Sequence, residues 1–256
     1  MYPELLTVGP LTFHTYGLLV ATGFLTGIWW MARLGEQEGI SKDDMYDIAF
    51  WVVVAALVGS RIFFVIVNYP QYLEHPLDAL KIWTGGLVFY GGLIGAVVAM
   101  VVMTRIKKLR LWKLADISAP ALALGHSIGR LGCFFAGCCY GLKTDLPWAV
   151  TFTNVKTIAP MGVPLHPTQL YDSFNELSMF LILTALRPYK KFEGQLWWLW
   201  LGLYAIGRSV VEMYRGDPRG TVFDGTLTTS QAVAVVALTV AVIMHIWNWR
   251  ALTARS

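Results

Sequence analysis

The sequence predicts an all-α membrane protein that crosses the bilayer several times. Of its 256 residues, 56% are hydrophobic and 14% are charged, and the mean hydropathy is +0.55. A soluble domain of ordinary composition carries about 25% charged residues. Eleven Trp and eleven Tyr suit the two membrane interfaces, where an amphipathic ring lies between headgroups and acyl chains. An isolated span must satisfy its own backbone hydrogen bonds, which favours helices.

Seven apolar segments have about the 20 residues that a bilayer span needs. They are residues 13–34, 47–67, 86–103, 114–135, 169–186, 196–213 and 227–247. The fourth and fifth are the most polar. We expect one membrane domain over residues 1–256, with external cap segments near 68–85 and 141–168. The alternation in residues 148–153, WAVTFT, predicts a short strand pair within the second cap.

The basic residues indicate the orientation of the chain. With the N-terminus outside, inside segments carry twelve of the twenty Lys and Arg, outside segments carry five, and three lie within spans. Cytoplasmic loops carry the excess of basic residues, so we expect the N-terminus outside and the C-terminus in the cytoplasm. Residues 1–10 lack a basic region before the first apolar run, and we expect no cleavable signal peptide.

Composition also narrows the class of partner. The net charge of +4 is modest and its basic residues lie at loop ends, so nucleic acid is not an expected partner. The three cysteines, Cys133, Cys138 and Cys139, lie within seven residues and are no disulfide framework. Their C-x4-C-C spacing does not match a zinc motif, and we expect them to pack, with no metal and no cofactor.

Ionisable residues within the spans indicate a functional site, since each is costly to insert in a membrane. Arg61, Arg130 and Arg208 lie in spans two, four and six. Asp172 and Glu176 lie in span five, and Glu212 follows Arg208 by one helical turn. A guanidinium fork suits phosphate, so converging arginines predict a phospholipid headgroup site. Gly202 and Gly207 are expected to leave room for a ligand beside Arg208. Two alternatives remain: Arg208 and Glu212 only pair with each other, or the charges form a transporter network.

The segment GHSIGRLGCFFAGCCYG, residues 125–141, combines glycines with Arg130. Its glycine density predicts that the helix ends near Gly137. Irregular backbone at membrane depth is tolerated inside protein or around a cavity. We therefore expect a cavity here, open to the outer leaflet, with Arg130 at its edge. The segment HPTQLY, from His166 through Gln169, has the same polar character and enters span five from outside.

These residues resemble the phosphatidylglycerol–prolipoprotein diacylglyceryl transferase family. The resemblance rests on five ordered blocks: Tyr16-Gly17-Leu18, GGLVFYGGLIGA (85–96), the segment 125–141, HPTQLYDSFNE (166–176) and YAIGRSVVEMYRGDPRG (204–220). It implies seven spans in the bacterial plasma membrane and a site toward the periplasm. The implied reaction moves the sn-1,2-diacylglyceryl group of phosphatidylglycerol to the lipobox cysteine of a prolipoprotein signal peptide, forming a thioether and releasing glycerol phosphate.

The resemblance also implies residue roles. It assigns functional positions to six residues, with Arg130 and Arg208 holding the lipid phosphate: Tyr16, Arg130, Gly141, Tyr204, Arg208 and Glu212. This chain departs from the family where Tyr90 stands in place of a histidine, Cys133 in place of an asparagine and Cys138 in place of a glutamate. The family's usual base is therefore absent from its position.

The acceptor thiol must lose its proton, and the remaining histidines are the local candidates. His126 and His166 could each act as the base, with Tyr90 as a hydrogen-bond relay, and His126 could equally be structural. We expect His166 and Gln169 to contact substrate. Two other functions stay open. A transporter or lipid-moving protein would need a pathway to the inner side, and a thiol-redox protein would depend on the three cysteines.

Overall fold

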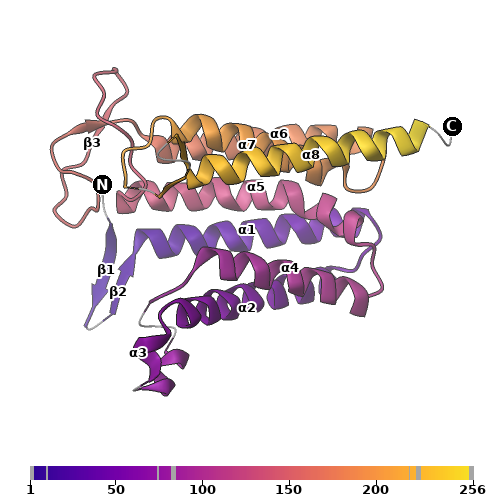
Figure 1. Ribbon diagram of the computed structural model, residues 1–256, viewed down its shortest axis with the longest axis horizontal. Coiled ribbons are helices and arrows are strands. Elements are labelled where there is room, and N and C mark those ends of the chain that lie inside the picture. Colours follow the sequence, from indigo (N-terminus) through magenta and orange to yellow (C-terminus); the bar gives the residue numbers. More distant parts are fainter. Residues whose placement is uncertain are drawn as a thin grey trace. The chain divides into compact units, whose positions relative to one another are not determined.

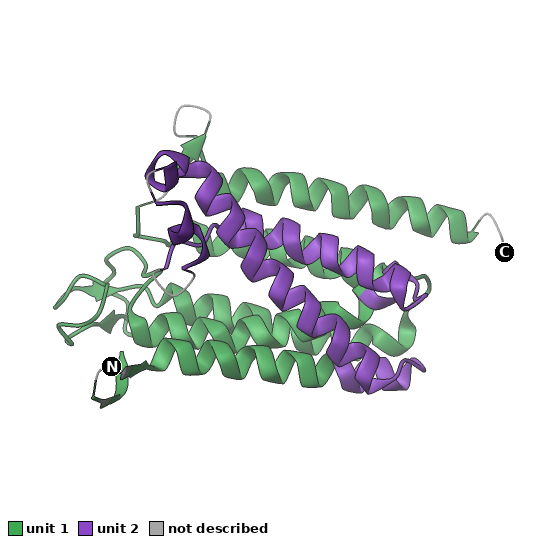
Figure 2. Cartoon of the chain, turned by 90° about the horizontal axis from the view of Figure 1, so that it is seen from below, with its two compact units in different colours: residues 1–31, 115–256 green, residues 32–114 purple. Residues whose placement is uncertain are grey.

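The structure is a computed structural model that describes residues 3–9, 11–73, 75–81, 85–218, 220–222 and 226–253. It is predominantly helical, which confirms the all-α class. The chain divides into two compact units, residues 1–31 with 115–256 and residues 32–114 (Figure 2). Within the described residues, seven helices have 18 or more residues: α1 (Thr15–Gln37), α2 (Lys42–Val67), α4 (Phe89–Ile106), α5 (Leu111–Ala136), α6 (Thr168–Leu186), α7 (Gln195–Glu212) and α8 (Thr229–Thr253).

Four of these helices, α1, α2, α4 and α8, are long and apolar enough to cross a membrane. The other three, α5, α6 and α7, coincide with the predicted fourth, fifth and sixth segments within a few residues. These three carry the ionisable side chains that the sequence singled out. The protein is therefore a multi-pass membrane protein whose most polar helices contain the candidate site.

In the larger unit, α7 packs against both α6 and α8 (Figure 1). Helices α1 and α5 approach through small residues. A Cβ added to Gly23 would lie 2.5 Å from the Gly125 carbonyl oxygen, and one on Gly27 would lie 3.0 Å from that of Ala121. Small residues allow this close contact between membrane helices because no side chain separates the backbones. Ala119, Leu183 and Leu196 form a buried cluster of α5, α6 and α7.

A buried carboxylate fixes the start of α7. Asp116 of α5 accepts hydrogen bonds from the backbone N–H groups of Gly194, Leu196 and Trp197 at 2.8, 2.9 and 3.1 Å. These are donors that a helix start leaves without an intrahelical partner, and a negative charge is favourable there. Lys190 lies 3.3 Å from the same carboxylate and offsets its charge.

Between α5 and α6 the chain folds into a small lobe. Strand β3 (Val150–Thr151) pairs antiparallel with β4 (Pro164–Leu165), which confirms the predicted strand pair. Phe152, Ala159 and Leu165 form its buried core. Two further hairpins join β1 (Glu4–Val8) to β2 (Leu11–His14) and β5 (Thr221–Val222) to β6 (Leu227–Thr228).

The smaller unit, residues 32–114, is built on α2 and α4. They cross so closely that a Cβ on Gly59, Gly91 or Gly95 would overlap backbone or side chain of the facing helix. The short helices α3 (Tyr69–Leu73) and η1 (Pro76–Leu80) follow α2. Arg61 is buried and donates to the carbonyl oxygens of Asp78, Ala79, Gly85 and Gly86 at 2.7, 2.8, 2.6 and 3.2 Å. Its charge therefore anchors this connecting segment to α2.

Candidate active site

Two polar rungs join the antiparallel helices α5 and α6 of the larger unit (Figure 1). His126 Nδ1 lies 2.8 Å from Glu176 Oε1, and Arg130 Nη2 lies 2.9 Å from Asp172 Oδ2. The members of each helix are four residues apart and therefore share a face. Between the rungs, Ser173 Oγ donates to the Ser127 carbonyl at 2.8 Å. Spacing of i, i+4 on both helices thus aligns four ionisable groups in one stripe.

The arginines are paired with carboxylates but keep N–H donors unused. Arg208 forms an ion pair with Glu212, and its Nη2 also donates to Ser230 Oγ at 3.3 Å. Arg208 Nη1 and Arg130 Nε are buried, and neither has a hydrogen-bond partner among the described residues. Buried donors in native proteins are almost always satisfied. Arg130 and Arg208 thus each keep one buried donor that is available to an acceptor from outside the described residues.

Tyr204 of α7 lies within the electrostatic field of both arginines. Its phenol interacts electrostatically with Arg130, Arg208, Asp172 and Glu176. The His126 ring lies 6.1 Å from the Tyr204 ring, centroid to centroid. The structure thus brings five of the predicted site residues into one neighbourhood: His126, Arg130, Tyr204, Arg208 and Glu212.

Arg215 also lies at this site; it belongs to the block 204–220 that carries the family resemblance, but it is not among the six functional positions that the resemblance assigns. The Arg215 side chain is 2% exposed, and Asp217 binds it through two hydrogen bonds of 2.8 and 2.9 Å. Its Nη1 lies 3.8 Å from Asp172 Oδ2, so Asp172 lies between two guanidinium groups. Burial opposes its charge, yet the Asp217 carboxylate raises the pKa of Arg215 above its ordinary value. The sequence Arg215-Gly-Asp217 after α7 was the signal that could have indicated this ion pair.

Gly141 packs against the chain that follows α7. Its N–H donates to the His166 carbonyl at 3.1 Å, and a Cβ would lie 2.5 Å from that oxygen and 2.8 Å from the Tyr214 carbonyl oxygen. Gln169 Nε2 donates to the Cys138 carbonyl at 2.7 Å. His166 Nδ1 lies 3.2 Å from the Tyr171 hydroxyl. These residues fix the backbone after α5, which ends at Ala136 as the sequence predicts.

The two remaining predicted residues lie on other helices. Tyr16 of α1 is 44% exposed and interacts electrostatically with Arg130 and with the three cysteines. Tyr90 is the second residue of α4 in the smaller unit and is 48% exposed, and its ring centroid lies 5.8 Å from that of Phe89. Its role stays a prediction.

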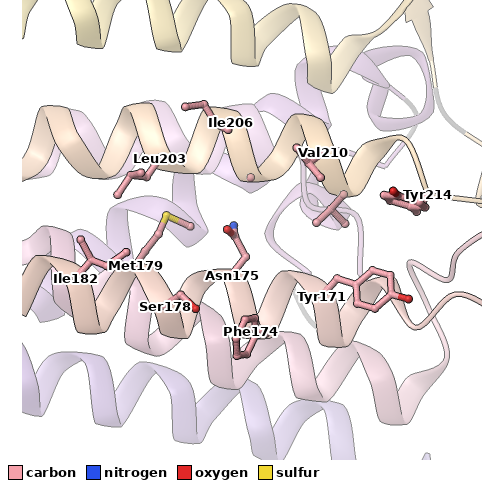
Figure 3. A pocket seen from close by; sticks show the side chains of 12 residues that line it. Tyr171, Phe174, Asn175, Ser178, Met179, Ile182, Leu203, Ile206, Val210 and Tyr214 are labelled. Carbon is pink, nitrogen blue, oxygen red and sulfur yellow. The ribbon is translucent and has the colours of Figure 1, made fainter. Parts of the chain in front are cut away.

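An apolar groove of about 510 Å³ separates α6 from α7 on one side (Figure 3). Its lining comes mainly from side chains of both helices: Phe174, Asn175, Ser178, Met179, Leu203, Ile206 and Val210. Neither Arg130 nor Arg208 lines it, so this groove is not the cavity that the sequence predicts.

The expectation that Gly202 and Gly207 leave room for a ligand has a different outcome at each glycine. A Cβ on Gly202 would touch Ala241 and Leu238 of α8, so this glycine is used in helix packing. A Cβ on Gly207 would overlap the Asn175 amide, and both of these residues line the groove between α6 and α7.

Known proteins with similar sequences are transferases. The family model described as prolipoprotein diacylglyceryl transferase matches residues 3–247. A phosphatidylglycerol–prolipoprotein diacylglyceryl transferase of Clostridium tetani is 33% identical over 245 residues, covering 95% of this chain and 96% of that protein. The proteins of the same name from Finegoldia magna and Bacillus velezensis are 37% and 32% identical. They align with 90% and 96% of this chain and with 89% and 92% of their own lengths.

Proposed function

This chain belongs to the prolipoprotein diacylglyceryl transferase family, and we propose that its buried arginine pair holds the lipid phosphate during the transfer. The protein moves the diacylglyceryl group of phosphatidylglycerol to the cysteine thiol of a prolipoprotein, a step of lipoprotein maturation. The thiol sulfur forms a bond to the glycerol carbon, the carbon–oxygen bond to phosphate breaks, and glycerol phosphate leaves. The negative charge of the leaving group must therefore be stabilised.

The unfilled donors of Arg130 and Arg208 carry this proposal. Arg130 Nε and Arg208 Nη1 are buried and lack acceptors in the described part of the chain, while Asp172 and Glu212 hold the two guanidinium groups in position. A phosphate oxygen supplies the missing acceptor, and a hydrogen bond between charged partners is strong where water is scarce. The Tyr204 hydroxyl, which interacts electrostatically with both arginines, is the third hydrogen-bond donor toward the phosphate in this proposal.

His126 is the general base in this proposal. An ionised carboxylate only accepts hydrogen bonds, so Glu176 holds the proton on His126 Nδ1 and leaves Nε2 with a free lone pair. The His126 side chain is 36% exposed, whereas Glu176 is 2% exposed. This is the arrangement of a positioned base: a buried carboxylate orients an imidazole that an incoming thiol can reach. In this proposal, His126 takes the role of the histidine that the family has at the position of Tyr90.

The apolar groove between α6 and α7 suits the acyl chains of the lipid. Asn175 and Gly207 meet at the groove, and Gly207 precedes Arg208 directly in α7. A lipid whose chains lie along Ser178 and Leu203 could therefore extend its phosphate toward Arg208. Hydrophobic lining with one polar group is typical of sites that bind an amphipathic molecule.

The proposed topology has seven spans, an outside N-terminus and a cytoplasmic C-terminus. The excess of basic residues on one side supports it. The lobe that holds β3 and β4 follows the end of α5 nearest Arg130, and in this topology it caps the periplasmic side. The active site then faces the periplasm of a bacterial plasma membrane, where secreted precursors arrive. In this proposal, residues 1–256 act as one membrane domain that includes both compact units.

A reconstituted transfer reaction tests the proposal. Purified protein in phosphatidylglycerol vesicles should add one diacylglyceryl group to a lipobox peptide, seen by mass spectrometry, and vesicles of phosphatidylethanolamine alone should give no product. Arg130→Ala and Arg208→Ala should each lower the rate by at least about a hundredfold, since a lost transition-state donor costs that much.

Arg33→Ala, an exposed arginine of α1, is the matched control and should keep the wild-type rate. Circular dichroism should show unchanged helix content in all three variants. Wild-type transfer by folded Arg130→Ala and Arg208→Ala would refute the assigned role of the two arginines.

A further inference from the structure

Three thiols converge where α5 ends. The Sγ atoms of Cys133, Cys138 and Cys139 all lie within 4.8 Å of one another, and each residue is partly buried. The proposed transfer uses none of them, because its acceptor thiol belongs to the prolipoprotein. A cluster of three sulfur atoms in a membrane protein with three cysteines in all is therefore a feature that the reaction leaves unexplained.

The backbone is bent and held so that the thiols meet. After Ala136, Gly137 has φ +72° and Cys139 has φ +61°, a conformation that residues other than glycine rarely adopt. Thr168 Oγ1 donates to the Cys139 carbonyl and Gln169 Nε2 to the Cys138 carbonyl, each at 2.7 Å. Both donors are fully buried. The turn that directs Cys138 and Cys139 back toward Cys133 is thus fixed by α6 and needs little rearrangement to bind a ligand.

The spacing of the sulfur atoms is close to the spacing that one metal ion requires. Zinc binds thiolate sulfur at about 2.3 Å, so three sulfurs around one ion lie about 4 Å apart. Contraction by less than about 1 Å would bring thiols that lie within 4.8 Å of one another to this spacing. We propose that Cys133, Cys138 and Cys139 form a three-thiolate site for a thiophilic d10 cation such as Zn²⁺, whose fourth position is left to an outside ligand.

Charge around the cluster favours this occupant. Three thiolates with one divalent ion carry a net charge of −1, and binding releases the three thiol protons to solvent. Arg130 Nη1 lies 4.0 Å from Cys133 Sγ, and Arg215 interacts electrostatically with Cys139. Two guanidinium groups therefore face the excess negative charge. The C-x4-C-C spacing did not predict the site, because the thiols meet through the left-handed backbone conformation of Gly137 and Cys139 and not through the turn of a standard zinc motif.

Metal binding to the intact protein in detergent tests the proposal. Anaerobic titration should show one Zn²⁺ per chain, and Co²⁺ should give the near-ultraviolet sulfur-to-cobalt charge-transfer absorption of thiolate ligation. Cadmium-113 NMR of the unmutated protein should report three sulfur ligands, a measurement that needs no variant to fold. Each single Cys→Ser variant should bind Zn²⁺ at least about tenfold more weakly.

The triple Cys→Ser variant should bind no Zn²⁺, while Ala136→Ser in the same segment should bind it like the wild type. Three results would overturn the proposal: less than one Zn²⁺ bound per wild-type chain, binding that persists in the folded triple variant, or a disulfide between two of these cysteines in protein isolated without reductant.

Discussion

Replacing Glu176 with glutamine changes one buried carboxylate into an amide of nearly equal size. The amide can donate to His126 Nδ1, and the imidazole then carries its proton on Nε2, where it cannot accept one from a thiol. His126→Gln removes the base itself. Without a working base, both variants can therefore transfer the lipid only to acceptor cysteines whose thiol is already ionised.

The size of the effect follows from the acceptor. A cysteine thiol with a pKa of about 8.5 is only about 3% ionised at pH 7, so a reaction that depends on this fraction is at least about thirtyfold slower. The rate of either variant should rise about tenfold per pH unit until about pH 8.5, where the deficit becomes small. The double variant should be no slower than either single one, because residues that act as a unit give non-additive losses.

The assay is initial transfer rate to a lipobox peptide between pH 6 and pH 9, with Asp145→Asn, an exposed carboxylate of the lobe, as control. The control should follow the wild-type profile at every pH. A wild-type rate at pH 7 and an unchanged profile in both His126→Gln and Glu176→Gln would refute the assignment of the base.

Three other changes have expected results. Arg61→Met should lower the free energy of unfolding by about 3 kcal/mol, because four backbone carbonyls lose their donor, whereas exposed Arg105→Met should change it little; equal melting temperatures in detergent would contradict this. Ser178→Trp should fill the groove between α6 and α7 and slow transfer at least tenfold, while Leu177→Trp, at a residue that does not line the groove, should not. Equal transfer rates in the two variants would show that the groove does not hold the acyl chains. The triple Cys→Ala variant should transfer within a few fold of the wild-type rate in metal-free buffer, since the nucleophile belongs to the substrate, and loss of transfer by a folded variant would favour the thiol-redox alternative.

The long helices could be predicted from the sequence because an apolar run of about 20 residues favours a helix that spans the bilayer. The end of α5 could be predicted as well, since Gly137 supplies a conformation that a helix cannot continue. The short strands were harder to predict, because few residues show the alternation that is typical of a strand. The hairpin of β1 and β2 was missed because five and four residues next to an apolar helix are too few to show their own period.

Most residues of the site could be predicted, but not which side chain of α5 pairs with which carboxylate of α6. Sequence spacing shows that His126 and Arg130 share one helix face, and that Asp172 and Glu176 share another. Which carboxylate meets which base depends on how far α5 and α6 slide along each other, and no local pattern encodes that register. The pairing of Arg208 with Glu212 was one of the alternatives because these residues are one turn apart, whereas the pairing of Arg130 with Asp172 could not be predicted. Arg215 was assigned no role because its position in a loop does not reveal its burial.

The most direct measurement is a structure of the protein with phosphatidylglycerol bound in a membrane-like environment. We expect one phosphate whose oxygens lie about 3 Å from Arg130 Nε and from Arg208 Nη1, with acyl chains along the groove between α6 and α7. A headgroup bound elsewhere, with both donors still unfilled and both carboxylate pairs unchanged, would contradict the assignment of the arginine pair to the lipid phosphate.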